Sequence, residues 1–239
     1  KFSWYDPNIS KYTQMSGQEM QKHDPQEVDD YCFRTILSRR HDYVNINLAA
    51  GGSSNQKQFR LAEEYFNTDD YKKYDNVIVL WGITSTARLD VWNNKKNRYV
   101  NFHLTKLPNL QWATDHYNHD TELSRLSTQM HHWDNYFEMI GVKNYWFDTF
   151  NHHDYTYDSP NMIMQHEKPR DLMSNLCIDM GHNSSMNNYH HSKWVLDDDR
   201  IKFLRKKNLV NPITHHPNRE CSILLADMLD KFVNFCYYK

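Results

Sequence analysis

The stretch GGSSN, at positions 51–55, gathers residue types that could do chemistry. Glycines let a backbone turn sharply, and free N–H groups at the start of a helix can bind an anion or a developing oxyanion. Three roles fit: a phosphate cradle, a serine nucleophile, or a tight turn with helix-capping serines. No GKS or GKT follows, which excludes a P-loop. The spacing is not Gly-x-Ser-x-Gly, so we expect Ser53 and Ser54 to cap a helix that begins near Asn55.

Fifteen histidines, several of them in HH pairs, raise the alternative of a metal site. Adjacent side chains diverge on a helix or a strand, so HH pairs rarely give two ligands to one ion. The four cysteines form no CxxC pair, and this number in a chain of 239 residues favours free thiols in a reducing compartment over a disulfide framework. We therefore expect no metal ion and no cofactor.

The elements that must position the GGSSN turn alternate between helix and strand. Residues 24–40 have acids early, bases late and apolar residues at helical spacing, as in a helix matched to its dipole. A strand is predicted at 43–50 and a helix at 56–66. The near-continuous apolar run at 76–83 suits a strand buried on both faces. This alternation predicts a parallel sheet with helices outside it.

The remainder of the chain gives a weaker pattern. A further strand is predicted at 142–151, and helices at 121–140, 197–208 and 219–239. The predicted fold is α/β, a three-layer flavodoxin-like sandwich formed by one domain over 1–239, with insertions at about 93–141 and 152–195. Such a domain normally opens with a central strand. Because this chain opens with a loop and a helix, we expect the first strand to be missing from the sequence or degenerate.

Composition narrows the classes of partner. The net charge is −2 and charged residues are spread along the chain, which argues against nucleic acid. No run of 18 apolar residues occurs, and the start KFSWYDPNIS lacks the regions of a signal peptide. We expect a soluble protein that does not bind a membrane.

Three blocks together resemble the SGNH (GDSL-like) hydrolase superfamily, and most closely the divergent SGNH-like proteins of tailed phages. The blocks are NLAAGGSSN at 47–55, WGITSTARLDVW at 81–92 and HHPN at 215–218. The resemblance covers 43–92 and 210–235, and hardly touches the middle of the chain. It implies an esterase in which a backbone N–H at Gly52 contributes to the oxyanion hole and His216, before proline, acts as the base.

Three departures from the family pattern bear on activity. Thr84 stands where the family has an asparagine oxyanion donor, and the loss of one such donor typically costs about 100- to 1000-fold in rate. Asn55 or Arg88 could compensate. The acid upstream of His216 is replaced by Ile213 and Thr214, so the orienting carboxylate would come from Asp148 or from the run at 197–199.

The nucleophile is the third departure. The family serine follows the first strand, and here Ser3 is the serine nearest to that place. Two alternatives remain open: a serine esterase whose nucleophile lies at or before the start of this sequence, or a degenerate module of a virus particle. The first would act on a small ester or an acetylated carbohydrate, plausibly as an O-deacetylase; the second would bind other virion proteins. A phage-encoded protein would be found in the host cytoplasm or the virion.

Overall fold

The computed structural model describes residues 32–49, 53–104, 111, 115–149, 153–163, 171–182, 199–210 and 217–235. The chain divides into two compact units, one formed by Leu48–Leu172 and the other by Lys1–Asn47 with Met173–Lys239. The structure is mixed α/β, with a small parallel sheet in the unit Leu48–Leu172.

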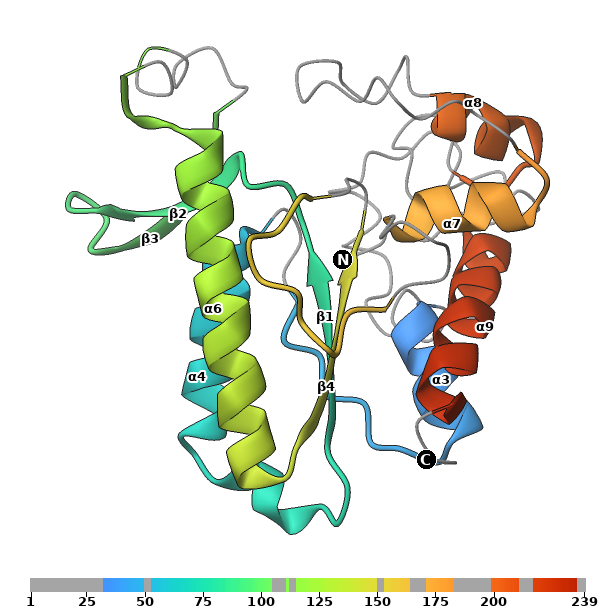
Figure 1. Ribbon diagram of the computed structural model, residues 1–239, viewed down its shortest axis with the longest axis horizontal. Helices are drawn as coiled ribbons and strands as arrows, with labels where there is room; N and C mark the ends of the chain where they lie inside the picture. Colours follow the sequence, from blue (N-terminus) through green and yellow to red (C-terminus); the bar gives the residue numbers. More distant parts are fainter. Residues whose placement is uncertain are drawn as a thin grey trace. The chain divides into compact units, whose positions relative to one another are not determined.

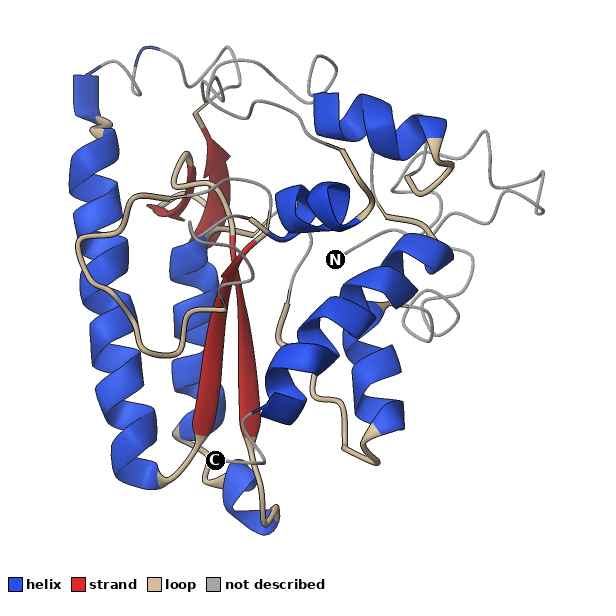
Figure 2. Ribbon diagram, turned by 45° about the vertical axis from the view of Figure 1, so that its right-hand side comes forward, coloured by secondary structure: helices blue, strands red, loops and turns tan. Residues whose placement is uncertain are grey.

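The parallel sheet is formed by two strands far apart in sequence. Strand β1 (Ile78–Ile83) pairs with β4 (Lys143–Asp148), and Trp81 is the register partner of Trp146. Helices α4 (Asn55–Phe66) and α6 (His119–Ile140) lie on the same side of this sheet (Figures 1 and 2). A short 3-10 helix, η2 (Asp70–Lys73), links α4 to β1. The predicted helix at 56–66 and the parallel strands at 76–83 and 142–151 are thereby confirmed, with slightly shifted ends.

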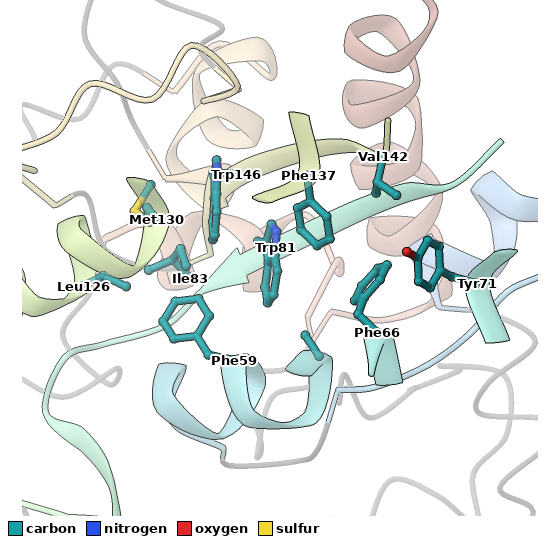
Figure 3. Close-up of a cluster of buried hydrophobic side chains, with 11 residues drawn as sticks. Phe59, Phe66, Tyr71, Trp81, Ile83, Leu126, Met130, Phe137, Val142 and Trp146 are labelled. Atoms are coloured by element: carbon teal, nitrogen blue, oxygen red, sulfur yellow. The ribbon is translucent and has the colours of Figure 1, made fainter. Parts of the chain in front are cut away.

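An aromatic core joins α4 and α6 to the sheet. The rings of Trp81 and Trp146 stack with centroids 4.9 Å apart, and Phe59 of α4 and Phe137 of α6 pack around them (Figure 3). Burial of large aromatic rings contributes much of the free energy of folding, and offset or tilted pairs add to it. Helix α6 lies inside the segment 93–141 that we expected to be an insertion, yet its buried face makes it a core element of this unit.

A buried carboxylate fixes α6 to the sheet. Asp134 of α6 is 6% exposed and accepts five hydrogen bonds. The donors come from β4 and the segment after it: Asn144, Trp146, Tyr157, Ser159 and Asn161. Burial alone would raise the pKa of Asp134, but the hydrogen bonds outweigh it and lower the pKa. Residues 157–161 fall in the second expected insertion, and this network ties them to the core.

A β-hairpin that we did not predict follows β1. Strands β2 (Arg88–Asn93) and β3 (Arg98–His103) pair antiparallel, with Trp92 opposite Tyr99. The turn between them is ordered by Asn93, whose carbonyl and Oδ1 both accept the N–H of Lys96. The described residues thus contain two separate two-stranded sheets, the parallel pair β1–β4 and the antiparallel pair β2–β3.

The other unit is helical in its described residues. It contains α3 (Phe33–Arg40), most of α7 (Leu172–Asp179), α8 (Asp199–Lys206) and α9 (Arg219–Phe235). Arg40 at the end of α3 binds Asp227 of α9 at 2.7 Å, and Arg200 of α8 donates to Ser174 of α7 at 2.9 Å. Predicted helices at 24–40, 197–208 and 219–239 are confirmed within the described residues.

The strand predicted at 43–50 is wrong over 43–49. These residues form neither helix nor strand, and the apolar side chains of Val44 and Ile46 are 66% and 42% exposed. A strand requires a hydrogen-bonded neighbour, and apolar character alone does not supply one. Among the described residues, none pairs with this segment as a strand.

Candidate active site at the carboxyl ends of the parallel strands

The candidate site lies where β1 and β4 end, beside the start of α4. In parallel α/β sheets, ligands bind outside the carboxyl ends of the strands. Ser54 caps α4 by accepting the N–H of Lys57 at 3.1 Å, which confirms the capping role predicted for this serine. No acidic residue occupies the first turn of α4, so the positive end of its dipole is not neutralised within the helix.

Two side chains of α4 complete the edge of β1 that faces away from β4. The carbonyls of Val77 and Ile83 accept hydrogen bonds from backbone N–H groups at the two ends of β4. Because backbone groups alternate between the two edges of a strand, those of Gly82 and Thr84 lie on the opposite edge. There, Gln58 donates to the carbonyl of Gly82 at 3.1 Å. Asn55 uses both ends of its carboxamide on the Thr84 backbone, with two hydrogen bonds of 2.9 Å. Asn55 thereby fixes Thr84 against the N-terminus of α4.

The hydroxyl of Thr84 is the unusual group in this arrangement. Thr84 is 8% exposed, and its Oγ1 is buried without a hydrogen-bond partner among the described residues. A buried hydroxyl without a partner costs about 1–3 kcal/mol, so folded proteins leave few such groups unpaired. Asn55 holds the backbone of Thr84, whereas no described residue binds its hydroxyl, which suits a donor kept for a ligand.

Gly82 allows β4 to approach β1 closely at the same point. A Cβ at residue 82 would lie 3.0 Å from Cγ2 of Thr149 and 3.3 Å from the ring of Phe147. Thr149 cannot easily move, because its N–H and Oγ1 both donate to the carbonyl of Ile83, at 2.9 and 2.7 Å. A glycine at position 82 is therefore required by the close packing of Thr149 and Phe147.

The carboxylate of Asp148 ends β4. It is 3% exposed, accepts the backbone N–H of His153 at 3.0 Å and binds the hydroxyl of Tyr155. Burial, followed by the charge of Asp148, raises the pKa of Tyr155 well above its ordinary value, so Tyr155 stays a neutral donor. Asp148 thus holds the segment after β4 in place. The alternative acid Asp199 begins α8 and pairs with exposed Lys202 at 3.3 Å.

Sequence reasoning missed a second polar cluster near the end of β1. The hydroxyl of Thr86 lies 2.9 Å from the hydroxyl of Tyr117 and 3.1 Å from Nδ1 of His119, which are themselves 3.3 Å apart. Burial raises the pKa of Tyr117, against the opposing effect of the Thr86 hydrogen bond. Thr86 is more than 30 positions from Tyr117 and His119 and has no motif spacing to them, so no sequence signal could have joined the three residues. They attach the turn after β1 to the start of α6.

Other predicted residues fall in different places. Ser3, Gly52 and His216 lie outside the described residues. The residue after the HHP block, Asn218, directly precedes α9 and caps it: its Oδ1 accepts the N–H of Cys221 at 2.9 Å. Burial lowers the pKa of Arg88 at the start of β2. The cysteines at 32, 177 and 221 are free thiols, as predicted.

No family model, curated protein or solved structure matches this chain. The SGNH resemblance therefore stays a prediction, and the geometry of the described residues carries the functional argument. Among those residues no three His, Cys, Asp or Glu side chains are placed to hold a metal ion. Within the same part of the chain, no helix is both long and apolar enough to span a bilayer.

Proposed function

We propose that this chain is an SGNH-like serine esterase, acting on an O-acyl group such as the acetyl ester of a carbohydrate. The observation that carries the proposal is the buried Thr84 hydroxyl, unpartnered among the described residues and held by Asn55 beside the N-terminus of α4. A donor fixed in this way can stabilise the oxyanion of a tetrahedral intermediate without reorganising. The proposal includes the finer fold, a flavodoxin-like three-layer sandwich around the β1–β4 pair.

The roles in the reaction follow from this proposal. A serine Oγ, with Ser3 as the candidate in this sequence, attacks the acyl carbon while His216 takes its proton. The N–H of Gly52 and the hydroxyl of Thr84 donate to the oxyanion. The C–O bond to the sugar then breaks, and His216 returns the proton to the leaving alcohol. Water activated by His216 releases the acid and restores the serine.

One observation favours the alternative, a non-catalytic module that binds other proteins of a virus particle. Asn55 directs its carboxamide to the Thr84 backbone, and Asp148 is bound by Tyr155 and the N–H of His153. Asn55 and Asp148, two of the side chains that could replace missing catalytic groups, therefore carry structural hydrogen bonds. Serine hydrolysis needs nucleophile, base and oxyanion donors as a unit, so the loss of several of them would abolish turnover.

Hydrolysis of p-nitrophenyl acetate distinguishes the two functions. The esterase predicts turnover above buffer that disappears in His216→Ala, with His132→Ala as a matched histidine control on the exposed side of α6. Circular dichroism and thermal unfolding must show that each variant is folded. No turnover by the folded wild-type protein would contradict the esterase and favour the non-catalytic module.

A further inference from the structure

The β2–β3 hairpin carries two exposed aromatic rings side by side. Trp92 and Tyr99 face each other across the strands, are 47% and 46% exposed, and have ring centroids 5.1 Å apart at an interplanar angle of 78°. Figure 1 shows the hairpin reaching past α6, clear of the β1–β4 sheet. Large aromatic side chains are normally buried, so an exposed adjacent pair marks a candidate contact surface.

A chain of polar contacts holds this aromatic pair in place. The guanidinium of Arg60 in α4 lies over the ring of Tyr99, 4.9 Å from its centroid. Arg60 is fixed in turn by Asp90 at 3.2 Å and by Glu64 at 3.0 Å, and the Asp90 side chain is only 4% exposed. Rings held in this way lose little conformational entropy when a ligand binds. The surface is therefore preorganised.

The same hairpin is strongly basic. Lys95, Lys96 and Arg98 are exposed, and none has an ion-pair partner among the described residues. The end of the hairpin, VWNNKKNRY at 91–99, contains no acidic residue, and Asp90 just before it pairs with Arg60. Lys95 and Lys96 lie in the turn that joins the strand ends carrying Trp92 and Tyr99, whereas Arg98, next to Tyr99 in β3, points to the opposite face of the hairpin. Cations at the tip and two aromatic rings together complement a ligand that has both flat apolar faces and negative charges.

We propose that the β2–β3 hairpin binds an acidic polysaccharide, with a sugar ring packed on Trp92 and Tyr99 and uronate carboxylates paired with Lys95 and Lys96 in the turn. A pyranose ring presents a face of C–H groups that packs on an aromatic ring. The inference rests on the proposed function, because it takes the ligand to be a carbohydrate. It adds that this carbohydrate carries acidic groups. Single-stranded nucleic acid is disfavoured by the net charge of −2.

Affinity electrophoresis in gels that contain polygalacturonate tests the inference. The wild-type protein should be retarded by polygalacturonate, but not by dextran, a neutral polysaccharide. Trp92→Ala/Tyr99→Ala should weaken the apparent affinity about tenfold. Lys95→Ala/Lys96→Ala should weaken it similarly and reduce its dependence on salt. Tyr43→Ala and Lys72→Ala/Lys73→Ala remove an exposed ring and two exposed cations elsewhere, and should bind as the wild type does.

Several results would overturn the inference: no retardation of the wild type, equal retardation by dextran, or unchanged binding by both hairpin variants. Retention of an oligothymidylate without retention of polygalacturonate would make the surface a nucleic-acid site instead. Turnover of p-nitrophenyl acetate by the wild type separates this inference from the proposed function. Turnover without polysaccharide binding would refute the hairpin surface alone, whereas binding without turnover would support the surface and refute the esterase.

Discussion

Asn55 and Thr84 form a two-bond clamp at the end of β1. Oδ1 of Asn55 accepts the N–H of Thr84 and Nδ2 donates to its carbonyl, both at 2.9 Å. The side-chain carboxamide of Asn55 thus forms the hydrogen bonds that a neighbouring strand would otherwise form with the Thr84 backbone. Since Asn55 is the first residue of α4, the clamp couples the start of this helix to Thr84, the residue that follows β1.

Replacement of Asn55 by alanine should destabilise the fold. The change leaves the N–H and carbonyl of Thr84 without these partners in a buried place, which we expect to cost about 2–3 kcal/mol of unfolding free energy. Chemical denaturation checks this value. Gln56→Ala is the matched control, because Gln56 is the exposed neighbour in the same turn of α4. Equal stability of the two variants would show that the clamp contributes nothing.

Replacement of Thr84 by valine should separate stability from activity. The hydroxyl has no hydrogen-bond partner among the described residues, so its removal should leave the thermal midpoint unchanged or raise it. If that hydroxyl stabilises the oxyanion, kcat for p-nitrophenyl acetate should fall roughly 100-fold. Thr84→Ser, which keeps the hydroxyl, should retain most of the activity. A stable Thr84→Val variant with wild-type kcat would remove Thr84 from the oxyanion hole.

The acid sensitivity of the fold should depend on Asp134. Its pKa is lowered in the folded state, so its stabilisation is complete above the pKa of an unfolded Asp, about 3.9. This contribution is lost as the pH falls from there through the lower pKa of the folded state. Asp134→Asn should lose about 3 kcal/mol or more at pH 7, because a buried acceptor is replaced by a group that also donates.

Denaturation of wild type and Asp134→Asn across the acid range tests this assignment. The wild-type free energy of unfolding should fall more steeply below pH 4 than that of the variant. Asp158→Asn is a matched carboxylate control, because Asp158 lies in the same segment after β4 but is exposed. Parallel pH curves for wild type and Asp134→Asn would show that Asp134 is not the source of acid sensitivity.

Contact between Gly82 and Thr149 should appear as coupling in a double-mutant cycle. Gly82→Ala places a methyl group 3.0 Å from Cγ2 of Thr149 and should cost about 1–3 kcal/mol. Thr149→Ser removes that methyl while keeping the hydroxyl that binds Ile83, so the double variant should recover part of the loss. Additive free energies would mean that the clash is relieved in another way.

The parts of the fold predicted from sequence are those with local patterns. Strands β1 and β4 and helices α4 and α6 have apolar runs or helical periodicity, and their burial follows from those patterns. The hairpin was missed because Asn93 to Asn97 lay in a polar stretch that we assigned to an insertion, although an Asn-rich turn between two β-type runs was its signal. The strand at 43–50 failed because strand formation depends on a partner.

The candidate site was predictable only in part. The GGSSN turn indicated the cap at Ser54, and the end of an apolar run indicated the position of Thr84. The use of Asn55 on the Thr84 backbone, and the joining of Thr86 to Tyr117 and His119, depend on tertiary contacts between residues about 30 positions apart. Fixed spacing carries no information about such contacts.

Covalent labelling with a fluorophosphonate tests the central claim, that the chain is a serine esterase, most directly. Mass spectrometry of the folded protein should show one adduct, which peptide mapping should place on a serine, with Ser3 as the candidate, and the adduct should be lost in His216→Ala. An unchanged mass for the folded wild-type protein, under conditions that fully label a control serine hydrolase, would contradict the account.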